Sequence, residues 1–315
     1  MSKKILVTGG LGYLGSVLCE HLLDAGYQVK AVDNLMYGQG QQGLFHLCAH
    51  PGFDFVKGDV RDESLMKGAV KDADAIVHLA AIVGASACDR DPEMSTSVNL
   101  ESVKLLNRLR SKHQLVIYPN TNSGYGSTEG TSYCTEETPL VPISLYGTTK
   151  CEAEKHLLDS QNAITLRLAT VFGMAPRMRL DLLVNHFVYT ALNEGYIVIF
   201  EKDFKRNYVH VRDVADCMLH CIANAPKMVG RPYNVGLDSA NLSKEELALK
   251  VQQYISKFYI HFAAIGQDPD KRNYIVSSDR LRKTGFEAQR SLDAGIQELI
   301  KGYRMMGRPL FKNAA

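Results

Sequence analysis

The sequence lacks the features that would mark a membrane, secreted or nucleic-acid-binding protein. No apolar run approaches the length of a membrane span, and the N-terminal stretch MSKKILVTGG has too short an apolar run for a signal-peptide core. The 36 basic and 34 acidic residues are interspersed, without the basic stripe that a nucleic-acid partner requires. We therefore expect a cytoplasmic protein with neither a membrane nor a nucleic-acid partner.

Paired cysteines are lacking as well. The seven cysteines are odd in number, scattered and free of any C-x-x-C pair, which favours free thiols in a reducing compartment. Cys217 and Cys221 lie one helical turn apart beside His220, so a metal site can be imagined there. The surrounding run DVADCMLHCIA has the pattern of an amphipathic core helix, and we expect that helix and no metal.

What is present is the composition and periodicity of a soluble α/β protein. Hydrophobic residues make up 45% and charged residues 22% of the chain, and short β-rich runs alternate with longer helical patterns. This alternation predicts a doubly wound parallel sheet, the Rossmann fold. The expected strands are Lys4–Thr8, Gln28–Asp33, Asp54–Gly58, Ala75–Leu79, Leu115–Tyr118 and Ala163–Leu168, and the expected helices are Gly15–Ala25, Asp62–Val70, Met94–Lys112 and Gly147–Asp159.

The pattern loosens after the sixth expected strand. The stretch MAPRMRLDLLVN is neither a clean strand nor a clean helix, whereas RNYVHVRDV and YNVGL again resemble strands and the start of a helix. We therefore expect a Rossmann domain of residues 1–172 and 207–240. A smaller mixed α/β lobe would comprise residues 173–206 and 241–315.

A glycine-rich turn opens the chain. In ILVTGGLGYLGSVLCEHLL, Gly10, Gly12 and Gly15 satisfy G-x-G-x-x-G between a strand and a helix, where glycines let the backbone approach a pyrophosphate at the helix N-terminus. Asp33 ends the next strand, where a carboxylate accepts both hydroxyls of an adenine ribose and repels a 2′-phosphate. The combination predicts NAD rather than NADP as the cofactor.

A second motif indicates acid–base chemistry. In SLYGTTKCEAEKHLL, Tyr146 and Lys150 are four residues apart and share one face of an expected helix. A nearby ammonium favours the phenolate, and lowering the tyrosine pKa by about three units requires roughly 4 kcal/mol of differential stabilisation. The lysine and a positively charged nicotinamide ring together would supply it.

With these motifs in place, the whole chain resembles the extended short-chain dehydrogenase/reductases, a family of sugar-nucleotide epimerases, dehydratases and dehydrogenases. The resemblance rests on TGGLGYLG, Asp33, KGDV, HLAA, VNL, YGTTK and RNYVHVRDV. It implies Thr121, Tyr146 and Lys150 as catalytic residues, with Tyr146 as the base. The implied cofactor-binding residues are Gly9, Gly12, Tyr13, Leu14, Gly15, Asp33, Asn34, Asp59, Val60, Leu79, Ala80, Ala81, Asn99, Tyr146 and Lys150.

The resemblance also implies a nucleotide-diphosphate sugar as substrate, bound mainly by the second lobe. The implied substrate residues are Thr121, Asn122, Ser123, Arg177, Arg179, Asn185, Arg206 and Arg272, with Arg206 meeting the diphosphate and Asn185 a phosphate. The chain departs from many relatives at Thr170, where they have Asn, and at Gly266-Gln267-Asp268, where they have R-P-G. These departures leave the base and the sugar open.

The choice of reaction depends on YPNTNSGYG. Dehydratases of the family follow the threonine with an acid pair or at least a Glu, whereas this chain has Asn122 and Ser123, which disfavours dehydration. The amino-acid sequences of several stretches are similar to those of the bacterial GDP-manno-heptose 4-dehydrogenases of capsule biosynthesis, which oxidise C4. A nucleotide-sugar 4-epimerase and a non-catalytic NAD sensor are the alternatives. The family resemblance also implies at least a homodimer.

Overall fold

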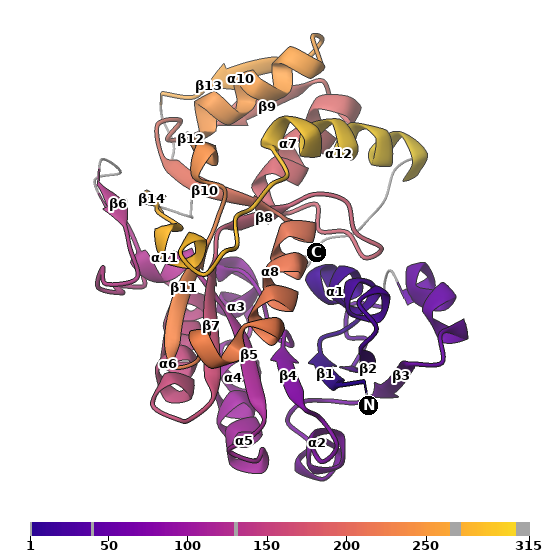
Figure 1. The fold of residues 1–315 in the computed structure, drawn as a ribbon. Helices are drawn as coiled ribbons and strands as arrows, with labels where there is room; N and C mark the ends of the chain where they lie inside the picture. The colour runs from indigo at the N-terminus through magenta and orange to yellow at the C-terminus, as the bar shows by residue number, and fades with distance from the viewer. Residues whose placement is uncertain (1, 39–40, 129–131, 265–271, 307–315) are drawn as a thin grey trace.

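A seven-stranded parallel sheet forms the centre of the protein, in the order β11-β7-β5-β4-β1-β2-β3 (Figure 1). The computed structural model describes residues 2–38, 41–128, 132–264 and 272–306. This sheet confirms the doubly wound α/β fold. Its strands are β1 (Lys4–Thr8), β2 (Gln28–Asp33), β3 (Phe53–Lys57), β4 (Ala75–His78), β5 (Leu115–Thr121), β7 (Ala163–Leu168) and β11 (Arg231–Val235).

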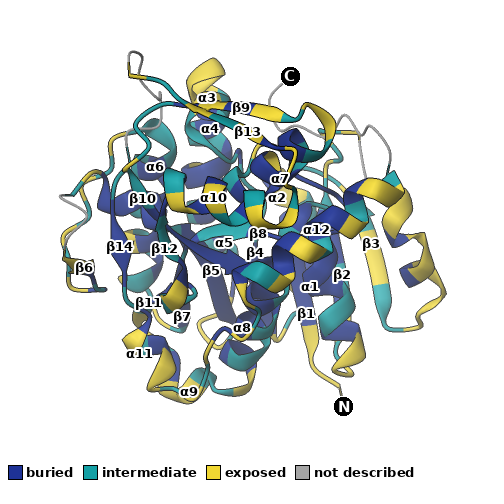
Figure 2. Ribbon diagram, turned by 90° about the horizontal axis from the view of Figure 1, so that it is seen from above, coloured by how far each residue is buried: buried dark blue, intermediate teal, exposed yellow. Residues whose placement is uncertain are grey.

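Both faces of the sheet are buried under helices. Along β1, Ile5 and Val7 belong to the apolar core that contains α1 (Tyr13–Asp24) and α8 (Val211–Ala223), whereas Leu6 belongs to the core on the opposite face. The alternation follows from the two-residue period of a strand. The helices of the second face are α2 (Glu63–Val70), α5 (Ser102–Leu109) and α6 (Leu145–Leu158). Figure 2 shows the inner strands of the sheet buried between these layers, whereas the edge strand β3 and the outer sides of the helices carry exposed residues.

The remaining elements gather beyond the carboxyl ends of the strands, in the upper part of Figure 1. Helix α7 (Leu183–Asn193) packs against α10 (Lys244–Tyr254) and α12 (Leu292–Met306), beside the strand pair β9 (Tyr196–Ile199) and β13 (Tyr259–Phe262). Three short strands, β8 (Thr170–Phe172), β10 (Lys205–His210) and β12 (Asn241–Ser243), form a second sheet. The division into two lobes at the expected residues stays a prediction.

Smaller elements complete the described chain. They are η1 (Gln41–Ala49), α3 (Ala85–Arg90), α4 (Pro92–Thr96), η2 (Ser97–Glu101), η3 (Asn122–Tyr125), β6 (Tyr133–Cys134), α9 (Ala225–Met228), η4 (Asp238–Ala240), β14 (Ile275–Val276) and α11 (Asp279–Arg282). Within the described ranges, no helix is both long enough and apolar enough to cross a membrane.

One expected helix is not a regular α-helix along its whole length. The run expected as Met94–Lys112 consists of α4, a π-helical turn (η2) and α5. The Ser102 hydroxyl donates to the Val98 carbonyl oxygen at 2.6 Å within this wider turn. Most of the irregular stretch MAPRMRLDLLVN is indeed neither strand nor helix, and only its last three residues begin α7. Cys217 and Cys221 are buried in α8 as expected for a core helix. Among the described residues, no three His, Cys, Asp or Glu side chains are grouped to hold a metal.

Candidate active site

A cavity of about 610 Å³ lies at the carboxyl ends of β1, β2, β4 and β5. Ligands of doubly wound sheets bind at this edge. The cavity brings together most of the residues that the sequence singled out. Of these, Gly9, Gly12, Tyr13, Leu14, Gly15, Asp33, Asn34, Asp59, Val60, Leu79, Ala80, Ala81, Thr121, Tyr146, Lys150, Arg177, Arg179, Arg206 and Arg272 line it.

The glycine turn between β1 and α1 leaves no room for side chains. Gly9 has a φ of +66°, and a Cβ on it would lie 2.8 Å from the Ala80 nitrogen. A Cβ on Gly15 would lie 2.2 Å from the Gly9 carbonyl oxygen. Gly12 caps α1 without a side-chain hydrogen bond, and the first residues of that helix, Tyr13 to Gly15, line the cavity. This arrangement fits a pyrophosphate at the helix N-terminus.

Asp33 is held at the end of β2 by the backbone. Its carboxylate accepts hydrogen bonds from the N–H of Leu11 at 3.0 Å and of Leu35 at 2.8 Å. Burial raises the Asp33 pKa, and the two backbone donors and the charge of Arg177 oppose that rise. Each carboxylate oxygen keeps a free acceptor position, which fits the two hydroxyls of a ribose. The residues at this end therefore fit the adenosine half of a dinucleotide.

Two acidic groups at the same end have different partners. Asp59 is paired with Arg61 at 2.8 Å and accepts from the Asn34 amide at 3.3 Å. The hydrogen bond from the Arg61 guanidinium is the main cause that lowers the Asp59 pKa to about 2. Asp59 is thus an anion at physiological pH, whereas the main influence on the Asp33 carboxyl is desolvation by burial.

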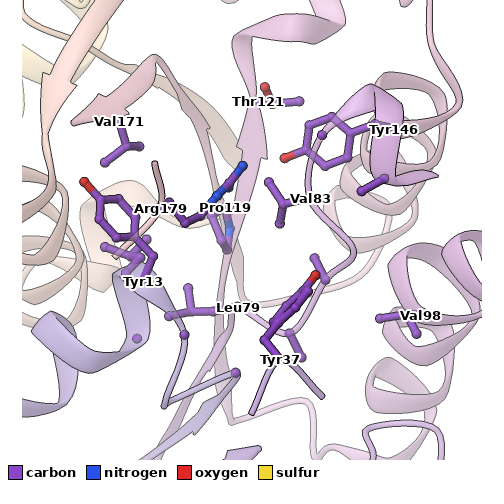
Figure 3. Close-up of a pocket in the computed structure, with 18 of the residues that line it drawn as sticks. Tyr13, Tyr37, Leu79, Val83, Val98, Pro119, Thr121, Tyr146, Val171 and Arg179 are labelled. Carbon is purple, nitrogen blue, oxygen red and sulfur yellow. The ribbon is translucent and has the colours of Figure 1, made fainter. Parts of the chain in front are cut away.

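The three expected catalytic side chains come from two elements. Thr121 ends β5, while Tyr146 and Lys150 lie one turn apart on α6, whose Ser144 side chain caps it by accepting from the Gly147 N–H. Figure 3 shows Thr121 and the Tyr146 hydroxyl directed into the same cavity. The Thr121 hydroxyl donates to the Ser123 hydroxyl at 2.9 Å. The expected catalytic constellation is therefore assembled by neighbouring strand and helix ends.

Burial dominates the electrostatics of this trio in the protein alone. It raises the pKa of Tyr146 to about 12 and lowers that of Lys150 to about 7. The Lys150 ammonium nitrogen lies 3.9 Å from the centre of the Tyr118 ring, a cation–π contact. The expectation that Lys150 lowers the Tyr146 pKa is therefore not met in the protein alone. Activation of Tyr146 needs additional positive charge.

Four arginines reach the cavity from three segments of the chain. Arg179 pairs with Asp181, with its Nε 3.1 Å from a carboxylate oxygen, and Arg206 donates to the Arg272 carbonyl oxygen at 2.6 Å. Arg272 in turn donates to the Ser123 hydroxyl. Together with Arg177 they provide the positive charge and the planar donors that suit phosphate groups.

Four expected site residues lie behind the cavity rather than on its surface. They are Asn99, Asn122, Ser123 and Asn185. The Asn99 amide exchanges hydrogen bonds with the Ile82 backbone at 2.8 and 2.9 Å, so it shapes the segment after β4. Asn185 accepts from the Gly173 N–H at 3.0 Å and donates to the Arg179 carbonyl oxygen at 2.9 Å. Direct ligand contacts of these residues stay predictions.

Two aromatic cavity residues were missed by the sequence analysis. Tyr37, just after β2, and Tyr274, just before β14, both line the cavity. The position of Tyr37 three residues after Asn34 was a usable signal, because that loop starts at a ligand-binding strand end. Tyr274 had no such signal. The departure at Gly266-Gln267-Asp268 lies outside the described residues.

A family profile described as the NAD dependent epimerase/dehydratase family matches residues 5–236. The chain belongs to this family. The expectation of an NAD-dependent enzyme of the sugar-nucleotide epimerase and dehydratase type is confirmed at that level.

Individual relatives of this epimerase/dehydratase cover nearly all of it. The "Low-salt glycan biosynthesis protein Agl12" of Haloferax volcanii is 28% identical over 95% of this chain and 98% of its own. A "dTDP-glucose 4,6-dehydratase" of Actinoplanes sp. is 28% identical over 96% and 98%. The crystal structure of a UDP-glucuronic acid 4-epimerase from Bacillus cereus, in complex with UDP-glucuronic acid and NAD, aligns with a TM-score of 0.86. It is 22% identical and covers 96% of this chain and 99% of that one.

Proposed function

We propose that this epimerase/dehydratase oxidises C4 of a nucleotide-diphosphate sugar and releases the 4-keto sugar. The proposed substrate is GDP-D-glycero-α-D-manno-heptose, in bacterial surface-polysaccharide (capsule) biosynthesis. Support for the nucleotide diphosphate comes from the four arginines around one cavity. Support for the heptose comes from the resemblance of the sequence to GDP-manno-heptose 4-dehydrogenases.

The observation that carries the proposed reaction is the pair of residues after Thr121. Elimination of water across C5 and C6 requires a carboxylic acid and a carboxylate near the sugar, and Asn122 and Ser123 provide neither. Both side chains are buried behind the cavity surface, and the Ser123 hydroxyl is held by Thr121 and Arg272. The two positions at which dehydratases of the family have acidic residues are therefore occupied by neutral side chains in this chain.

In the proposed mechanism Tyr146 accepts the proton of the C4 hydroxyl, to which the Thr121 hydroxyl also hydrogen-bonds. When bound, NAD supplies a positively charged ring and accepts the hydride that C4 loses. The charges of Arg179 and Arg272 oppose the burial that raises the Tyr146 pKa to about 12, and a protonated Lys150 would add to them. The sugar loses two hydrogens, one as a proton to Tyr146 and one as hydride.

The mass of the product distinguishes the possible reactions. We would incubate the purified enzyme with GDP-manno-heptose, GDP-mannose, UDP-glucose and dTDP-glucose in turn, with a dye that reoxidises NADH. Loss of two mass units from GDP-manno-heptose is the expected result. Loss of eighteen units would identify a dehydratase and overturn the proposal. A product of unchanged mass with a new retention time would identify a 4-epimerase.

The 4-epimerase is the second candidate. It uses the same three catalytic residues and differs in returning the hydride to the other face of the sugar. The structural similarity to a UDP-glucuronic acid 4-epimerase supports it. A non-catalytic NAD sensor is the third candidate, and the joint presence of Thr121, Tyr146 and Lys150 at one cavity argues against it. A bound nucleotide with no turnover of any sugar nucleotide would favour the sensor.

A further inference from the structure

The segment from Met174 to Leu182 crosses the cavity between β8 and α7. Its residues alternate, because Met178 and Leu180 belong to the apolar core whereas Arg177, Arg179 and Asp181 line the cavity. A Cβ on Gly43 would lie 2.8 Å from the Pro176 Cβ, so the segment also contacts the connection between β2 and β3. We call residues 174–182 the strap. It joins the second half of the chain to the part of the first half that carries Asp33.

The two arginines of the strap have different surroundings. The guanidinium carbon of Arg177 lies 4.5 Å from the centre of the Tyr37 ring, and its charge acts on Asp33. Arg179 is paired with Asp181 and its charge acts on Tyr146. Arg177 is therefore at the Asp33 end of the cavity, and Arg179 is toward the catalytic end.

Arg177 has an unused donor. Its side chain is only 3% exposed, and its Nη2 is buried with no hydrogen-bond partner in the described part of the chain. A buried guanidinium N–H without an acceptor is costly, and such groups are normally satisfied by protein, water or ligand. Because Arg177 lines the cavity beside Asp33, a ligand bound there would offer the missing acceptor.

We propose that Arg177 and Tyr37 form a clamp over the adenosine half of the bound dinucleotide. Asp33 accepts from the ribose hydroxyls, and Arg177 donates to an oxygen of the same ribose or the adjoining phosphate. The strap thereby gives a cofactor-binding residue to a lobe expected to bind only the sugar nucleotide. Arg177, expected from the sequence to contact the substrate, is reassigned to the cofactor.

The stacking geometry supports this assignment. A guanidinium on an aromatic face keeps its in-plane N–H donors free, so Arg177 can stack on Tyr37 and still donate at its edge. Lysine would keep the charge but lose the plane. Because Tyr37 lies in the β2 loop and Arg177 in the strap, their contact also closes the adenosine end of the cavity.

Binding measurements test the clamp without turnover. Purified wild-type, R177M, R177K, Y37L and R179M proteins would be freed of dinucleotide and titrated calorimetrically with NAD, ADP-ribose and GDP. We expect R177M to weaken NAD and ADP-ribose about ten- to a hundredfold, the usual effect of losing a hydrogen bond to a charged group. R177K and Y37L should weaken both ligands less. R179M is the matched control and should leave ADP-ribose affinity unchanged.

The outcomes separate the clamp from a substrate role. If R177M binds NAD and ADP-ribose like the wild type but loses affinity for GDP, Arg177 is a substrate residue and the proposal is wrong. If R177M fails to fold, R177K and Y37L decide by the same comparison, and unchanged affinity for ADP-ribose in both would overturn the clamp. The test rests on the family's cofactor rather than on the proposed C4 oxidation, so either inference can fail alone.

Discussion

Replacing Lys150 with methionine tests how strongly burial acts at the candidate catalytic centre. Lys150 is 4% exposed, and burial lowers its pKa from 10.5 to about 7. Methionine keeps an unbranched stem of similar length and cannot carry a charge. We expect K150M, in the protein without nucleotides, to be more stable than the wild type at pH 7 and to lose that advantage as the pH rises.

The sign and size of this pH-dependent stability difference follow from proton linkage. Between pH 7 and 10.5 the unfolded chain keeps the Lys150 proton that the folded protein has released, so wild-type stability rises with pH across this window. The limiting slope is about 1.4 kcal/mol per pH unit for one such group. The stability difference between K150M and the wild type should therefore shrink by about 2 kcal/mol from pH 7 to pH 9.

Urea unfolding at pH 7, 8 and 9, followed by far-UV circular dichroism, measures this difference. The matched control is K155M on the same helix, because Lys155 is exposed. A difference between K150M and the wild type that stays constant across the range would refute the reasoning. It would mean that Lys150 stays charged in the folded protein, with the Tyr118 ring sufficient to hold the ammonium.

Three further predictions concern the catalytic base, a buried ion pair and the glycine turn. Y146F should abolish sugar oxidation and leave the NAD affinity within a few-fold of the wild type; retained turnover would remove Tyr146 from its proposed role. E154Q should lower the free energy of unfolding by about 3 kcal/mol, because it removes the charge that pairs with buried Arg167 at 2.8 Å, whereas exposed E152Q should change it little. G15A should lower both the melting temperature and the dinucleotide content, since its Cβ would lie 2.2 Å from a carbonyl oxygen; a wild-type melting curve would contradict this.

The central sheet could be predicted because its signals are local. The ranges Lys4–Thr8, Gln28–Asp33 and Ala163–Leu168 were predicted to the residue, since apolar β-branched runs there stop at clear turn signals. The helix expected over Met94–Lys112 contains a π-helical turn that the sequence pattern did not predict. Asn99 in that turn holds the Ile82 backbone, and no helical periodicity encodes such a pairing.

In the candidate site, too, residues in local motifs could be predicted and contacts between distant segments could not. Thr121, Tyr146 and Lys150 could be predicted because they sit in short motifs at strand and helix ends. The contact between Tyr37 and Arg177 could not, because it joins a loop after β2 to the strap much later in the chain. The expected pKa change of Tyr146 was missed for a related reason. The prediction weighed the charges of Lys150 and of a nicotinamide ring and left out desolvation, which depends on everything packed around the tyrosine ring.

Gly173, which directly precedes the strap, has a consequence for motion between the two halves. Its carbonyl oxygen accepts from the Tyr13 hydroxyl at 2.7 Å, and its N–H donates to Asn185 at 3.0 Å. A Cβ on it would lie 2.5 Å from the His210 ring. A glycine with positive φ in a loop is an obvious candidate for a hinge. The two hydrogen bonds and the close approach of His210 restrain this one. We therefore expect Gly173 not to act as a hinge, so that any relative movement of the two halves would bend the chain at other residues.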